Sequence, residues 1–131
     1  MRMRPLIAAL IVAGTARASA QTFNKVQFIF FHSNDGKTEY NPPRQLVLTK
    51  AADIAKLTKF LPGLGLNKGG LKASGWDEWG TIRLMRAKGP GIAVFFPGDA
   101  KLFSMIGKSG AFPTAKGFKD YLLDIEKQAK Q

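Results

Sequence analysis

The chain contains one histidine, His32, which is followed closely by Ser33 and Asp35. Serine, histidine and aspartate are the residue types of a nucleophile, its general base and the carboxylate that orients the base. The sequence has no G-x-S-x-G nucleophile elbow, and one histidine with scattered carboxylates does not supply the ligands of a zinc site. We interpret His32 as a residue at a strand end and keep a small hydrolase using His32 as a remote alternative. We predict no catalytic residue, no metal and no cofactor.

Two segments share only part of a nucleotide-binding motif. Residues 106–109 (IGKS) match the end of a P-loop, but that motif needs a glycine where Leu102 stands and a helix that begins at the lysine. The loop at 62–75 is rich in glycine without the G-x-G-x-x-G spacing. Because long loops in small domains often carry binding function, we predict that this loop contacts a partner.

The adjacent acids Asp77 and Glu78 do not form a facing acid–base pair, because neighbours in a strand point to opposite faces. Asp99 lies in a Pro-Gly-Asp turn, where its side chain is expected to bond the backbone. The paired carboxylates of a glycosidase are therefore unsupported.

Aromatic and basic residues gather at and after the glycine-rich loop. An exposed tryptophan beside lysine or arginine suits stacking on a sugar or a cation–π contact. The alternative is that at least one tryptophan packs into the core because of its large apolar area. The predicted binding residues are Lys68, Lys72, Trp76, Trp79, Arg83 and Arg86.

Hydrophobic periodicity and turn signals predict five strands and two amphipathic helices. The two prolines at 42 and 43 favour an edge position for the second strand. Thr49 and Thr114 are the predicted helix N-caps. The strands are expected at 25–33, 44–48, 79–86, 92–96 and 102–106, and the helices at 50–61 and 115–128.

The element order β-β-α-β-β-β-α favours an α+β fold. Because three late strands have no helix between them, a parallel βαβ fold is disfavoured. We expect a two-layer domain in which a curled, mainly antiparallel sheet carries both helices on one face. No linker or repeat divides the chain after residue 20, so 21–131 is predicted to be one domain.

Residues 1–20 have the pattern of a cleavable signal peptide. Arg2 and Arg4 precede a short apolar run at 6–14, and Ala18 and Ala20 form a small-x-small cleavage site. The apolar run is too short to span a bilayer. We therefore expect export to the periplasm or the medium, cleavage between Ala20 and Gln21, and no transmembrane segment in the mature chain.

The formal net charge is +11, and it falls to +8 when residues 1–20, with three arginines and no acid, are removed. A positive excess favours an anionic polymer, a lipid headgroup or an acidic protein as partner. No strand of this chain has the aromatic and basic pattern of a nucleic-acid-binding sheet, so specific nucleic-acid binding is not expected. The absence of cysteine excludes thiol catalysis. The leading hypothesis is an exported, non-enzymatic binding module, and the alternative is a protein-interaction or inhibitor domain acting on another exported protein.

Overall fold

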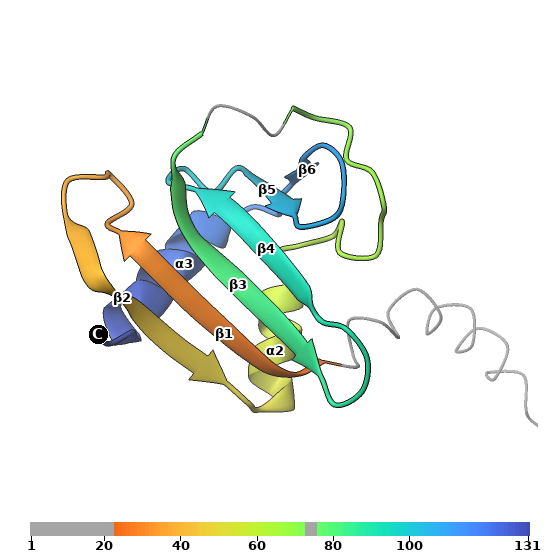
Figure 1. Cartoon of the computed structure of the whole chain (residues 1–131), viewed down its shortest axis with the longest axis horizontal. Coiled ribbons are helices and arrows are strands. Elements are labelled where there is room, and N and C mark those ends of the chain that lie inside the picture. Colours follow the sequence, from red (N-terminus) through yellow and green to blue (C-terminus); the bar gives the residue numbers. More distant parts are fainter. Residues whose placement is uncertain (1–22, 73–75) are drawn as a thin grey trace, which may run out of the picture.

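The computed structural model describes residues 23–72 and 76–131 (Figure 1). The predicted signal peptide and cleavage site lie outside these residues. The described chain forms a six-stranded sheet in which neighbouring strands run antiparallel, in the order β2-β1-β3-β4-β5-β6. The strands are β1 (Phe23–His32), β2 (Glu39–Leu48), β3 (Glu78–Arg86), β4 (Ile92–Pro97), β5 (Leu102–Met105) and β6 (Phe112–Pro113).

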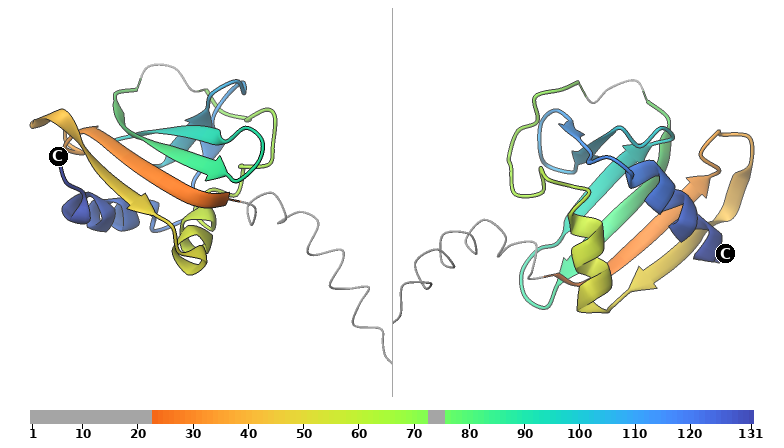
Figure 2. Two further views of the ribbon diagram at one scale, coloured as in Figure 1. Left: turned by 60° about the horizontal axis from the view of Figure 1, so that its bottom comes forward. Right: turned by 180° about the vertical axis from the view of Figure 1, so that it is seen from behind.

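Both helices, α2 (Ala51–Thr58) and α3 (Phe118–Gln128), lie on one face of the sheet (Figure 2). The opposite face carries no helix in the described part of the chain. The predicted two-layer α+β fold is therefore confirmed, with one strand more than expected. The extra strand, β6, has two residues, which is too short to leave a periodic signal.

The alternation of β1 explains why it lies inside the sheet, between β2 and β3. Val26, Phe28 and Phe30 are completely buried against the helices, whereas Gln27 and Ile29 are partly exposed on the other face. A strand that is apolar on its core face and partly apolar on the other face suits a central position.

An aromatic cluster fills the core beneath α3. The rings of Phe30, Trp79 and Phe96 lie with centroids 5.4 to 6.0 Å apart in tilted or edge-on geometry. The indole Nε1 of Trp79 donates a 3.0 Å hydrogen bond to Oε2 of Glu126, and the hydroxyl of Tyr40 donates to the same oxygen at 3.3 Å. Glu126 therefore ties α3 to two strands.

Both edges of the sheet are blunted. At β2, Gln45 and Lys130 exchange backbone hydrogen bonds of 2.8 and 3.0 Å, so the C-terminal residues cover part of that edge. Pro42 and Pro43 offer no N–H for pairing in the same strand. The other edge is the two-residue β6. These features leave little free backbone for an added strand.

The predicted helix caps were wrong. Lys50 is the N-cap of α2 and makes no side-chain cap bond there. α3 begins after Gly117, whose φ of 94° favours glycine. The hydroxyl of Thr114 instead donates to the carbonyl of Ala100 at 2.7 Å. Residues 114–117 thus connect β6 to α3 and do not form the first helical turn.

We expect Glu126→Ala to lower the free energy of unfolding by about 2–3 kcal/mol, because the buried indole N–H loses its acceptor. Glu126→Gln retains an acceptor oxygen and should cost less than half as much. Urea denaturation measures both values. Asp124→Ala, on the exposed side of α3, is the control and should change stability by less than about 0.5 kcal/mol. Equal effects at the two positions would contradict the role of Glu126.

Candidate anion-binding surface

The six predicted binding residues lie in three different environments. Trp79 is completely buried in the core, so it cannot contact a partner, which corrects the expectation for this residue. Its neighbour Trp76 is partly exposed. The indole of Trp79 is buried because β3 places it against Phe30 and Phe96.

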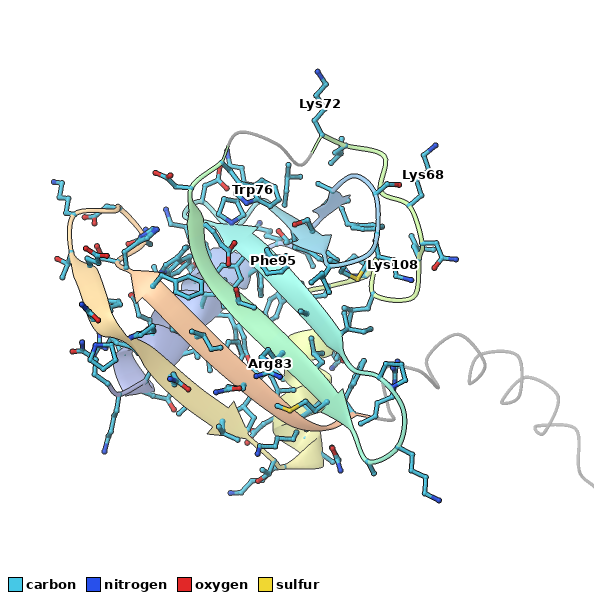
Figure 3. The ribbon with its side chains drawn as sticks, in the orientation of Figure 1. Lys68, Lys72, Trp76, Arg83, Phe95 and Lys108 are labelled. Carbon is cyan, nitrogen blue, oxygen red and sulfur yellow. The ribbon has the colours of Figure 1, made fainter. Side chains whose placement is uncertain are left out.

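Arg83 projects from the open face of the sheet. Along β3, Ile82 and Leu84 are buried on the helix side, and the intervening Arg83 is exposed. Figure 3 shows Trp76, Phe95 and Arg83 from the side that carries no helix. Trp76 and Phe95 are only partly exposed, so this face offers limited aromatic area.

Arg86 belongs to the helix side of the sheet, near its end. Its guanidinium lies 4.7 Å from the ring centroid of Phe23 and donates a 2.6 Å hydrogen bond to the carbonyl of Pro90. The side chain is therefore held in place by the hairpin between β3 and β4 and lies on a different face from Arg83.

The remaining predicted residues, Lys68 and Lys72, lie on a loop that pairs with a second loop. We call residues 62–72 and 106–111 the paired loops. They lie beyond β5, on the side of the molecule away from β2 and the C-terminus (Figure 1).

Backbone hydrogen bonds fix the two loops together. Gly69 N–H donates to Ser109 at 2.7 Å, and Leu71 and Ala111 exchange bonds of 3.2 and 2.7 Å. A side chain at Gly69 would collide with the backbone of Ala111, so glycine is required for this close approach. The glycine-rich loop is therefore an ordered surface over residues 62–72.

The paired loops carry three exposed lysines and no acidic residue. Lys68 and Lys72 come from the first loop and Lys108 from the second. The Nζ of Lys108 donates a 2.6 Å hydrogen bond to the side chain of Asn67, which joins the loops through side chains as well. Figure 3 shows the three lysines along one border of the molecule. Lys108 was not among the predicted binding residues, because its closeness to Lys68 depends on pairing between segments distant in sequence.

Exposed aliphatic side chains accompany these lysines. Leu66, Leu71 and Ile106 are 55%, 45% and 67% exposed. The other large hydrophobic residues exposed in the described chain, Phe31 and Val47, lie on β1 and β2. The paired loops thus combine positive charge with apolar surface.

A pocket of about 310 Å³ adjoins the paired loops. Leu64, Ile92 and Ile106 contribute apolar walls, and Arg86 and Lys108 contribute positive charge. A pocket of this kind suits a ligand with an anionic and an apolar part. The convergence of Arg86 with Lys108 is non-local and is not visible in the sequence.

The region of His32 has a different geometry. His32 lines a pocket of about 180 Å³ with Asp35, Asp77 and Asp99. The hydroxyl of Ser33 donates to Asp35 Oδ1 at 2.7 Å, and Nδ1 of His32 lies 2.6 Å from the carbonyl oxygen of Ser33. The serine proton therefore goes to the aspartate and not to the histidine. Within 23–72 and 76–131, no group of three histidine or acidic residues is arranged to hold a metal ion.

Hydrogen bonds to its carboxylate lower the pKa of Asp35. The largest contribution comes from the Ser33 hydroxyl, and the backbone N–H of Lys37 adds a second bond of 3.0 Å. These hydrogen bonds close the turn after β1. They account for the lowered pKa of Asp35 by a structural role.

Comparisons with protein-family models, with curated proteins and with solved structures find no match to this chain. In the described residues, no helix has the length and apolar character needed to cross a membrane.

We expect Ser33→Ala to raise the pKa of Asp35 toward that of an ordinary aspartate, because the main bond to the charged form is lost. In the unaltered protein this lowered pKa stabilises the turn above the unfolded-state pKa, and the contribution disappears as the pH falls through the folded-state pKa. An NMR titration of the Asp35 carboxyl carbon measures the shift. Ser104→Ala, on β5, is the control, and an unchanged midpoint in Ser33→Ala would refute the assignment.

Proposed function

We propose that this protein is an exported, non-enzymatic binding module that engages an anionic or acidic partner through the paired loops. The observation that carries the proposal is the ordered surface with Lys68, Lys72 and Lys108 and no acidic residue within it. Such a surface attracts anions over a distance of about one Debye length and loses this attraction in high salt.

The residues that we propose for this role differ in part from those predicted from the sequence. Lys68 and Lys72 remain, Lys108 joins them, and Trp79 is removed because it is buried. Arg86 contributes through the neighbouring pocket. Trp76 and Arg83 lie on the open sheet face, where they can extend the contact area of a larger partner.

The alternative of a protein-interaction or inhibitor domain receives less support. Docking by strand addition needs a free sheet edge, and here one edge is covered at Gln45 and the other is the short β6. Lysine is also depleted in protein–protein interfaces compared with the rest of the surface.

Export is the second part of the proposal and rests on the pattern of residues 1–20. We expect the protein recovered from a secretion-competent bacterial host to begin at Gln21, as measured by intact mass spectrometry. Ala20→Trp should block processing because the cleavage site requires a small residue there. Ser19→Trp, between the two small residues, is the control and should be processed. Recovery of the unaltered full-length chain would refute the prediction.

The anion-binding role is tested by a variant carrying Lys68→Gln, Lys72→Gln and Lys108→Gln. We expect it to elute from a heparin column at clearly lower salt than the unaltered protein, because the local positive surface is lost.

The control carries Lys50→Gln, Lys119→Gln and Lys127→Gln, which replace exposed lysines at the start of α2 and along α3. Both variants have the same net charge. If they elute together, retention depends on net charge and the assignment to the paired loops is wrong. If the unaltered protein is not retained, the anionic partner itself is excluded.

A further inference from the structure

The paired loops display side chains that a purely electrostatic contact does not use. Leu66, Leu71 and Ile106 are about half exposed or more, although water contact with large aliphatic groups is unfavourable. A hydrated polyanion does not bury such groups deeply. A partner with an apolar layer beneath an anionic surface would satisfy both the lysines and the aliphatic residues.

We propose that the paired loops bind the surface of an anionic lipid bilayer. Leu66, Leu71 and Ile106 enter the boundary between headgroups and acyl chains. The inference rests on the proposed function for its charge and adds the class of partner. Lys68, Lys72 and Lys108 contact the headgroups.

The arrangement of charge and apolar surface supports this assignment. Lys68 lies between Leu66 and Leu71 in sequence, and Lys108 follows Ile106 by two residues. Lysine side chains extend their methylene stems along apolar surface while the ammonium group remains at the headgroup level. Exposed leucine and isoleucine together with lysine therefore match the two layers of a membrane interface.

Rigidity of the paired loops also favours binding at a surface. The bonds of Gly69 and Leu71 to residues 109 and 111 hold the backbone in place before any partner arrives. The backbone polar groups that make these bonds need no further partner when water is removed. Insertion then buries side chains without a large cost of ordering the loop.

The neighbouring pocket has the same mixed character. Its walls include Leu64, Ile92 and Ile106, and its cationic groups come from Arg86 and Lys108. A phosphate near these two side chains would place the first part of an acyl chain against the apolar wall. In this proposal the pocket adds to the paired loops a site for one lipid molecule that is partly raised out of the bilayer.

Other anionic polymers are less well matched. Binding of single-stranded nucleic acids uses stacking of bases on aromatic side chains, and the paired loops contain no aromatic residue. Trp76 and Phe95 lie on the open sheet face and are partly buried. The exposed aliphatic residues consequently favour a membrane over a soluble polyanion as the partner.

The first test measures binding of the processed protein to vesicles by co-sedimentation. The vesicles contain phosphatidylcholine alone or with about 30% phosphatidylglycerol. We expect binding only to the anionic vesicles and a loss of about 100-fold when the three lysines of the paired loops are changed to Gln. Leu66→Ser, Leu71→Ser and Ile106→Ser together should reduce binding at least about tenfold without a change of charge.

The control variant carries Phe31→Ser and Val47→Ser, which remove exposed apolar side chains from the sheet. It should bind like the unaltered protein. Circular dichroism and thermal unfolding establish that each variant is folded.

The second test locates the inserted residue. Because the chain has no cysteine, Ile106→Cys creates one labelling site for an environment-sensitive fluorophore. We expect a blue shift with anionic vesicles and quenching by brominated lipid. A label at Val47→Cys should show neither effect.

The outcomes distinguish failure of lipid binding from failure of anion binding in general. Retention on heparin without vesicle binding would overturn the lipid assignment and leave anion binding intact. Vesicle binding that needs the lysines but is unaffected by the three serine changes would overturn insertion. Failure to bind either heparin or anionic vesicles would overturn both proposals.

Discussion

The two-layer arrangement depends on the hydrogen bonds that the carboxylate of Glu126 accepts. One oxygen accepts hydrogen bonds from Trp79 on β3 and Tyr40 on β2, so a single group on α3 connects the helix layer to an inner and an edge strand. A buried polar group is tolerated only where its partners are placed correctly. The hydrogen bonds of the carboxylate therefore favour one position of α3 on the sheet. Trp79, which donates one of these bonds, packs against Phe30 and Phe96 in the core.

The paired loops are connected to this core through β5 and β6. The rings of Phe103 and Phe112 stack with centroids 5.3 Å apart, which holds the second of the paired loops against the sheet. On the other side, Gly63 lies so close to the Phe112 ring that a β-carbon there would clash. Both loops are thus attached to the same aromatic pair. In a protein without disulfides, such packing must supply the rigidity that a covalent bridge supplies elsewhere.

The fold could be predicted from sequence because its main elements are defined by local patterns. The alternation in β1 and the 3.6-residue periodicity of α3 identify those elements, and the order of strands limits the topology. Local patterns failed at the helix starts, where Thr114 bonds to Ala100 and not to its own helix. They also failed for Trp79, because tryptophan has both an apolar body and a polar N–H and its burial depends on the distant Glu126.

The candidate surface was only partly predictable for a related reason. Lys68 and Lys72 stand in a loop recognisable by its glycines, but Lys108 joins them only through the pairing of residues 68–71 with 109–111. That pairing also decides which side chains remain outside. Backbone N–H and C=O groups of the two loops bond to each other and hold the loops in place. Leu66, Leu71 and Ile106 therefore remain exposed on the surface and do not pack into the core. Lysines among them divide the exposed apolar area into smaller parts, which keeps any one apolar patch small.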